Sequence, residues 1–238
     1  MPKIAITIPA YNEENRIRVM LDHYLLYFGN EVQFVVVANH CSDNTVGVVE
    51  GIQRQFPGRV QLINEPAAIG KGGAIVRGWK ASTEADIVGF VDADGATSPV
   101  EFDKVLKAAQ QADGAIASRF MKGATVLDRS SLLRKFVSWA ARRCFQILFL
   151  LPVNDTQCGA KVFKQSAIQP ILADLKTNDM LFDVELLWRL KQRNAHIIEV
   201  PTVWADQPGS AMLGSSHKFI SKAIQLFFNV LKLRVTLR

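Results

Sequence analysis

The sequence predicts an α/β fold, in which a mostly parallel sheet is flanked by helices. Two observations lead to this prediction: short apolar runs rich in β-branched residues alternate with stretches of helical periodicity, and a polar motif follows each apolar run. Strand–helix–strand units of this kind are right-handed, so their strands are parallel and the carboxyl ends meet at one edge of the sheet. We therefore expect a ligand site along that edge.

The expected elements alternate from the N-terminus onward. Apolar runs typical of strands covered on both faces occur at 3–10, 32–38, 60–63 and 86–92. Helices are expected between and after these runs, at 13–28, 43–56, 71–83 and 99–112. In the last helix Pro99 suits the first position, and either Thr97 or Ser98 suits the cap before it. The motifs PAYNEEN, NHCSDNT, NEPAAIGKGGA and DADGA follow the four strands in this order.

Length and composition indicate a single domain. The chain has 238 residues, of which 49% are hydrophobic, and no linker rich in Pro, Gly or Ser divides it. Its three cysteines form no CxxC pair, which favours reduced thiols in a reducing compartment. The N-terminus turns polar too early for a secretory signal, and uncharged runs such as 144–154 fall well short of the roughly 20 residues that cross a bilayer. We expect a cytoplasmic protein, soluble or peripheral on a membrane.

Two carboxylates stand one residue apart at the end of the fourth expected strand, in VDADGATSP. Many lone Asp-x-Asp pairs serve only in turns or helix caps. Two close carboxylates at the end of a buried strand repel each other, however, unless a cation lies between them. A hard divalent ion that also holds phosphate oxygens resolves this conflict. Asp92 and Asp94 are therefore expected to bind Mg²⁺ or Mn²⁺.

The glycine-rich stretch IGKGGA points to a phosphate-bearing ligand. Gly70, Gly72 and Gly73 are expected where backbone approaches that ligand, and Lys71 adds a point charge suited to phosphate. The stretch matches neither the Walker sequence nor the G-x-G-x-x-G fingerprint, which argues against an ATPase and against a dehydrogenase. A glycine-rich helix start that packs on the sheet is the alternative explanation.

Basic residues are concentrated in two segments of a chain whose net charge is +6. Residues 119–143 hold seven basic side chains against one acid, and residues 217–238 hold five and no acid. Both 132–151 and 217–238 place polar positions at helical spacing opposite apolar ones, which predicts amphipathic helices at an anionic membrane surface. The alternative is that both helices pack on the domain, or on a second copy in a homo-oligomer. Nucleic acid is not an expected partner, because no recognised binding motif accompanies these helices.

Eight motifs occur in the order seen in family 2 glycosyltransferases: ITIPAYNEEN, CSDNT, GKGGAIVRG, DADGAT, SRF, DTQCGAKVF, FDVELLWRL and EVPTVWADQPGS. The chain resembles most the branch of dolichyl-phosphate β-glucosyltransferases and polyprenyl-phosphate glycosyltransferases, from Ile4 to about Ser210. The resemblance implies the GT-A fold, a Rossmann-like and mostly parallel sheet with amphipathic helices near the C-terminal half. It divides the chain into a GT-A domain, 1–216, and a basic amphipathic helix, 217–238, which belongs to the same structural unit or to a membrane interface.

The resemblance also implies the reaction, which is the inverting transfer of a hexose, first of all glucose from UDP-glucose, to a polyprenyl (dolichyl or undecaprenyl) phosphate. The enzyme would act at the cytoplasmic membrane face. The residues expected to bind the metal–nucleotide donor are Pro9, Tyr11, Glu13, Asn39, Gly70, Lys71, Gly72 and Asp92. Asn39 and the preceding Ala38 stand where relatives carry two acids, and Ala211 and Met212 stand where relatives carry a lysine, so the base and one phosphate contact are left open.

The expected catalytic residues are Asp94, Arg119, Arg134, Ser138 and Asp155. Arg134 and Ser138 match residues that meet the acceptor phosphate in related enzymes, and Asp155 is expected either as a base or as a residue that orients Arg134 or the sugar. An ionised lipid phosphate needs no general base, so no histidine is required. Two alternatives remain: a glycosyltransferase with a soluble hydroxyl acceptor, and a non-catalytic nucleotide-sugar binding module or nucleotidyltransferase.

Overall fold

The computed structural model describes residues 2–127, 132–205 and 228–237, with side chains in the helix after residue 131 described from Trp139 onward. The elements are, in chain order, β1 (Ile4–Ala10), α1 (Ile17–Phe28), β2 (Val32–Asn39), α2 (Thr45–Gln55), β3 (Val60–Glu65), α3 (Gly70–Ala81), β4 (Ile87–Val91), α4 (Pro99–Gln110), β5 (Gly114–Ser118), β6 (Thr125–Leu127), α5 (Leu132–Phe149), β7 (Ala160–Lys164), α6 (Gln165–Ile168), α7 (Phe182–Gln192), β8 (Ile197–Pro201) and β9 (Val203–Ala205).

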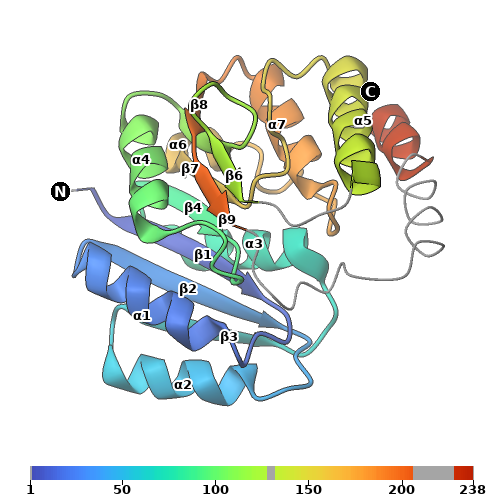
Figure 1. Ribbon diagram of the computed structural model, residues 1–238. Coiled ribbons are helices and arrows are strands. Elements are labelled where there is room, and N and C mark those ends of the chain that lie inside the picture. The colour runs from blue at the N-terminus through green and yellow to red at the C-terminus, as the bar shows by residue number, and fades with distance from the viewer. Residues whose placement is uncertain (1, 128–131, 206–227, 238) are drawn as a thin grey trace.

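A seven-stranded sheet with the order β3-β2-β1-β4-β7-β5-β8 forms the centre of the molecule (Figure 1). All neighbouring strands are parallel except at β7, which runs antiparallel to both β4 and β5. The predicted α/β class with a mostly parallel sheet is therefore confirmed. The short strands β6 and β9 form a separate parallel pair.

The four strands and four helices expected from the first 112 residues are all present, with ends that differ by a few residues. The largest difference is at α1, which begins at Ile17 because the preceding residues form a loop tied to the N-terminus of α2: the Glu13 N–H donates to Thr45 Oγ1 at 2.8 Å. Of the two candidate caps of α4, Ser98 is the one used, since its Oγ accepts a hydrogen bond from the Glu101 N–H.

Helices cover both faces of the sheet and enclose two cores. Helices α1, α2 and α4 cover one face of the sheet (Figure 1), and Ile17, Ile52 and Phe102 of these helices are buried in one core. On the other face α3, α5 and α7 enclose a second core around Trp79 and Phe182. Both layers hold the carboxyl ends of β1, β2 and β4 at one edge of the molecule.

The described part of the C-terminal segment packs on the domain. Residues 228–236 are helical, Val230 and Leu237 are buried in the second core, and Arg234 Nε donates to Leu148 O on α5 at 2.8 Å. This packing corresponds to the alternative left open for the segment; its remaining residues lie outside those described. Among the described residues, no helix combines the length and the apolar character that crossing a bilayer requires.

Candidate active site

Loops that follow β1, β2 and β4 bring most of the predicted donor-binding residues to one edge of the sheet. The register aligns Ala10 of β1 with Ala38 of β2, so that both strands end at the same level. Asp92 follows directly after the end of β4, which pairs with β1. The N-terminus of α3 adds Lys71 beside it. This is the edge at which parallel sheets bind ligands.

Asp92 and Lys71 form an ion pair in which Lys71 Nζ lies 2.6 Å from Asp92 Oδ1. The sequence predicts a phosphate contact for Lys71. The contact with Asp92 comes from the fold, which brings together the segments that follow β3 and β4. Burial by itself lowers the pKa of Lys71, but the carboxylates of Asp92 and Asp183 outweigh burial and hold that pKa above its usual value. The ammonium is therefore a permanent charge at this position.

Asp94 is partly buried, and its Oδ1 accepts a hydrogen bond from the Ala96 N–H at 2.9 Å. Burial raises the pKa of Asp94, and the neighbouring carboxylate of Asp92 raises it further. The repulsion expected from the spacing is thus present. Two hard oxygen donors that disfavour each other's charge fit a divalent cation.

Gly159 provides the room that the Asp92 carboxylate occupies. The Asp92 N–H donates to Gly159 O at 2.9 Å, and a Cβ built at residue 159 would collide with the Asp92 carboxylate oxygens. In the part of the chain that the structure describes, no group of three or more His, Cys, Asp or Glu side chains could enclose a metal ion. An ion held by Asp92 and Asp94 would therefore keep coordination positions open for other oxygen ligands.

Asp155 holds Arg119 in a two-point ion pair. Its Oδ2 accepts from Arg119 Nε at 2.8 Å and its Oδ1 from Arg119 Nη2 at 3.0 Å, while Oδ2 also accepts the Arg119 backbone N–H. The side chain is 1% exposed. Burial would raise the pKa of Asp155, but Arg119 outweighs it and the pKa is lowered. Asp155 thus orients Arg119, a partner that the sequence did not indicate. A carboxylate with a lowered pKa and both oxygens engaged by Arg119 is a poor proton acceptor.

The predicted nucleotide-pocket residues lie on β1, on the loop after it and at the end of β2. Pro9 lies within β1, and Tyr11 is exposed beside it. Glu13 pairs with Arg16 through two hydrogen bonds of 2.7 Å each, and burial raises the pKa of Glu13 although Arg16 opposes the shift. Asn39 Oδ1 accepts the Ile69 N–H at 3.0 Å, so it holds the start of α3. Arg16 is not among the residues predicted from the sequence, although an arginine three residues after a glutamate can form an ion pair with it.

The glycines at the start of α3 approach protein rather than open space. Gly70 has φ +68°, and side chains at Gly70 and Gly72 would collide with the backbone oxygens of Asn178 and Thr177. The Gly72 N–H also donates to Asn178 O at 2.9 Å. The close approach predicted for a ligand is therefore, at these two residues, packing against the segment before α7.

A buried ion pair behind the site had no predicted role. Lys161 on β7 is fully buried, and its Nζ donates to Asp183 Oδ1 at 2.7 Å and to the carbonyl of Cys158. Lys161 and Lys71 both lie over the ring of Phe90, at 5.2 and 5.4 Å from its centroid. The Cys158 carbonyl that Lys161 binds is next to Gly159, which contacts the Asp92 carboxylate. The ion pair of Lys161 and Asp183 therefore holds this loop in place.

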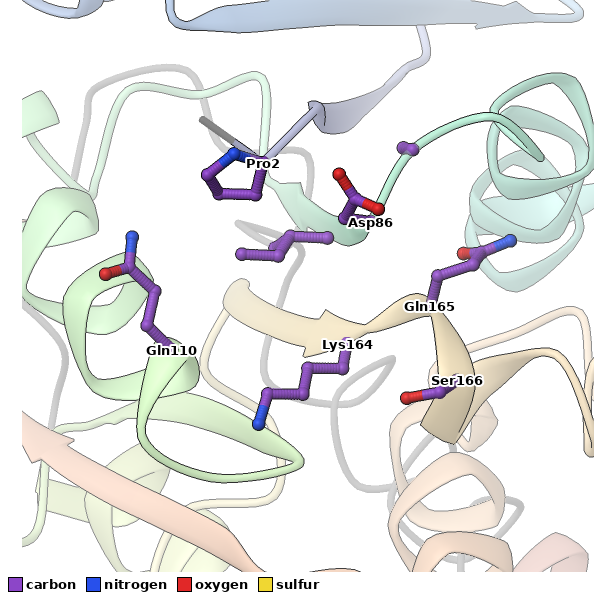
Figure 2. Close-up of a pocket in the computed structure, with 8 residues that line it drawn as sticks. Pro2, Asp86, Gln110, Lys164, Gln165 and Ser166 are labelled. Carbon is purple, nitrogen blue, oxygen red and sulfur yellow. The ribbon is translucent and has the colours of Figure 1, made fainter.

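Arg134 and Ser138 lie on α5, and their side chains are outside those described. The hollow drawn in Figure 2 lies elsewhere, at the amino ends of β1 and β4. It has a volume of about 570 Å³ and is lined by Pro2, Asp86 and Lys164, among others. Asp92 and Asp94 follow the other end of β4, so this hollow is separate from the candidate active site.

Comparison with known proteins agrees with the fold. The family model of glycosyl transferase family 2 matches residues 5–170. A dolichyl-phosphate beta-glucosyltransferase of Trichomonas vaginalis is 29% identical over 97% of this chain and 70% of its own length. The enzymes of the same name from Drosophila melanogaster and Saccharomyces cerevisiae are each 28% identical over 88% of this chain and 69% of their own length.

Solved structures share the architecture at low sequence identity. Glucosyl-3-phosphoglycerate synthase from Mycobacterium tuberculosis, crystallised with Mn²⁺, uridine diphosphate and glucosyl-3-phosphoglycerate, superposes with a TM-score of 0.71 at 17% identity. The match covers 98% of this chain and 80% of that one. TarS from S. aureus gives a TM-score of 0.57 at 16% identity over 85% of this chain and 59% of its own.

Proposed function

The chain belongs to glycosyltransferase family 2, and on that basis we propose that it transfers a hexose from a nucleotide sugar to a polyprenyl phosphate, with inversion at the anomeric carbon. The main structural support is the pair Asp92 and Asp94, which directly follows β4, a central strand of the sheet. Similarity to dolichyl-phosphate beta-glucosyltransferases over almost the whole chain supports the acceptor class and glucose as the sugar.

UDP-glucose is the donor that we propose. The relatives are named glucosyltransferases, and a structural neighbour was crystallised with Mn²⁺, UDP-glucose and phosphoglyceric acid. In the present chain the ring of Tyr11 is exposed beside β1, where it is available to a base. Asn39 lies at the end of the neighbouring strand β2, with one lone pair of its amide oxygen already used by Ile69.

Asp92 and Asp94 are the residues that would hold Mg²⁺ or Mn²⁺ against the donor diphosphate. Such an ion supplies Lewis-acid stabilisation of the negative charge that develops on the leaving nucleoside diphosphate. Lys71 adds a second positive charge at the same place, 2.6 Å from Asp92. Gly159 keeps the Asp92 carboxylate free of side-chain contact from that direction.

A phosphate acceptor agrees with the state of the carboxylates around the site. Asp155 is bound on both oxygens by Arg119 and has a lowered pKa, and Glu13 is bound on both oxygens by Arg16. A hydroxyl acceptor would need a base to remove its proton, whereas a lipid monophosphate is ionised at neutral pH and attacks directly. The pairing of Asp155 therefore favours the phosphate acceptor.

An acceptor panel tests this function. Release of nucleoside diphosphate from UDP-glucose is expected with polyprenyl phosphate and not with soluble hydroxyl acceptors, and GDP-sugars should be poor donors. Arg134→Ala should lower acceptor use about 10- to 100-fold while leaving UDP-glucose affinity nearly unchanged, because it removes a charge-assisted contact to phosphate. Arg134→Lys should restore only part of the activity, since lysine lacks the two-point fork.

Near-normal turnover of Arg134→Ala with polyprenyl phosphate would reject the phosphate-acceptor mechanism. Turnover with a soluble alcohol, together with a base pKa in the pH–rate profile of kcat, would instead identify the hydroxyl-acceptor enzyme. Release of nucleoside diphosphate that neither polyprenyl phosphate nor a soluble alcohol increases would contradict both transferase assignments.

We further propose that α5 and the C-terminal helix face an anionic membrane, where the lipid acceptor resides. Ile147 near the end of α5 and Leu150, which follows that helix, are 69% and 68% exposed, and Val235 of the C-terminal helix is also exposed. The basic residues of 217–238, with no acid among them, supply attraction to anionic lipid. A helix with such a face binds at the interface without spanning the bilayer.

Binding to vesicles that contain anionic lipid is expected to fall about tenfold or more in the double variant Ile147→Ser/Leu150→Ser, because each exposed apolar side chain contributes roughly 1.5–3 kcal/mol when it is buried in lipid. High salt should weaken binding of the unaltered protein. Leu26→Ser on α1 is the matched control, since Leu26 is 86% exposed but belongs to a helix on the other face of the sheet. Equal losses in both variants, or no binding of the unaltered protein at low salt, would contradict the proposal.

A further inference from the structure

Arg142 of α5 lies over the aromatic ring of Phe120, the residue after Arg119. Its guanidinium carbon is 4.3 Å from the ring centroid of Phe120, the residue that follows Arg119 in the SRF motif. The guanidinium of Arg119 is 5.7 Å from the same ring and 5.4 Å from the ring of Trp204. Two guanidinium groups therefore share Phe120, and both have planar faces suited to stacking on it.

The two guanidinium groups differ in how the protein satisfies them. Arg119 is neutralised by Asp155 through a two-point ion pair. Arg142 forms no ion pair with any carboxylate in the described part of the chain; Nη1 donates to Asn154 O at 3.5 Å, and Nε is buried with no hydrogen-bond partner there. The carboxylate of Glu199 is engaged elsewhere: its oxygens accept the backbone N–H groups of Asn154 and Asp155. Arg142 thus keeps a charge and hydrogen-bond donors that no carboxylate of the described residues binds directly.

Helix geometry places Arg142 in line with the predicted acceptor residues. Arg134, Ser138 and Arg142 follow one another at intervals of four, so these positions lie on one face of α5. The next residue, Arg143, is exposed, and its Nη1 donates instead to Gln146 Oε1 at 3.3 Å. Only one of these two adjacent arginines faces Phe120.

The surroundings of Arg142 favour the acceptor over the donor diphosphate. Arg119 is already bound on two nitrogens by Asp155, whereas Arg142 follows Arg134 and Ser138, the positions expected at the acceptor phosphate, at the same interval of four along α5. A phosphate monoester with two ionisable oxygens fits an arginine with free donors.

We propose that Arg142 binds the phosphate group of the acceptor, with Phe120 as the positioning residue that holds the guanidinium in place. The inference rests on the proposed function and adds to it a phosphate-binding residue that no motif of the sequence indicated. Its physical basis is a half-buried arginine that stacks on an aromatic ring, lacks a carboxylate partner among the described residues and lies in register with Arg134.

Arg142→Gln is expected to raise the KM for polyprenyl phosphate about 10- to 100-fold, because it removes a charge-assisted contact, while the Kd for UDP-glucose stays within about twofold. Arg142→Lys should restore part of the loss, since it keeps the charge without the planar fork. The matched control is Arg143→Gln, which removes the same charge from the neighbouring exposed residue. It should leave the KM within about twofold. Phe120→Leu should raise the KM less than Arg142→Gln does.

A direct binding measurement separates this inference from the proposed function. Citronellyl phosphate, a short isoprenyl monophosphate, is titrated calorimetrically into each protein without donor; Arg142→Gln should weaken its binding about tenfold or more, and Arg143→Gln should not. This result would support the inference even if turnover with polyprenyl phosphate were absent. Equal affinities of the unaltered protein and a folded Arg142→Gln variant would overturn it, as would a rise in the Kd for UDP-glucose alone.

Discussion

Asp94→Asn is expected to lower sugar transfer by about 10²–10³-fold, the usual loss when one charged group that stabilises a leaving group is removed. The substitution keeps the shape of the side chain and an oxygen that can still accept the Ala96 N–H. It removes one of the two carboxylates that we propose as ligands of the divalent ion. Asp92→Asn should be similarly damaging, and it also breaks the 2.6 Å ion pair with Lys71.

The stability of Asp94→Asn should move in the opposite direction to its activity. Burial and Asp92 raise the pKa of Asp94, which means that the folded protein disfavours its charged form relative to the unfolded chain. Removing that charge relieves repulsion, so Tm should be unchanged or higher. Mn²⁺ affinity, measured with the spin signal of the free ion, should fall.

The control for this variant is Asp22→Asn on α1, which removes an exposed carboxylate that pairs with Arg18 at 3.3 Å. It should change neither transfer nor Mn²⁺ affinity. Full activity of Asp94→Asn, or undiminished activity of the unaltered enzyme in excess EDTA, would refute the metal assignment. A Tm far below that of the unaltered protein would show that Asp94 has a structural role instead.

The part of the fold that could be predicted from sequence is the part set by local pattern. The runs that became β1, β2, β3 and β4 are continuous and β-branched, and the polar motifs after them mark the edge of a parallel sheet. The antiparallel strand β7 could not be placed in this way, because its position between β4 and β5 depends on pairing between residues far apart in the chain. Its sequence also contains Lys161, a charge that pattern analysis does not expect at the centre of a sheet.

In the candidate site, too, residues set by local sequence could be predicted, whereas contacts between distant segments could not. Asp92 and Asp94 could be proposed from the sequence because two close carboxylates at the end of a buried strand create an electrostatic conflict. The partners of Lys71 and Asp155 were not, because each ion pair joins residues from different elements that only the folded chain brings together. For the same reason Arg142 could be counted as basic from the sequence, but its stacking on Phe120 could not be foreseen.

The buried pair of Lys161 and Asp183 carries the largest expected effect on stability. Their side chains are 0% and 3% exposed, and the bond between them is 2.7 Å long. Removing one partner of such a pair leaves an uncompensated charge in the core, at a cost of about 3–5 kcal/mol in the free energy of unfolding. Asp22→Asn at the exposed Arg18 pair should cost about 1 kcal/mol or less by comparison.

The two single substitutions should not be equivalent, because the surroundings of the two charges differ. In Lys161→Met the carboxylate of Asp183 retains Lys71, whose pKa it already influences, as a nearby cation. In Asp183→Asn the ammonium of Lys161 keeps neutral acceptors, the amide oxygen and the Cys158 carbonyl, beside the ring of Phe90, but loses the carboxylate that is bound to it. Asp183→Asn is therefore expected to be the more destabilising change.

Urea unfolding of both single variants and of Lys161→Met/Asp183→Leu measures these differences. Replacing both partners by apolar residues of similar volume removes the charges together, so the double variant should lose clearly less stability than the sum of the singles. Because Lys161 also anchors the loop before Gly159, and Gly159 accommodates the Asp92 carboxylate, the double variant should recover stability yet retain a weakened affinity for Mn²⁺. Single variants that each cost less than about 1 kcal/mol, or costs that simply add, would mean that the pair is not the anchor inferred from its geometry.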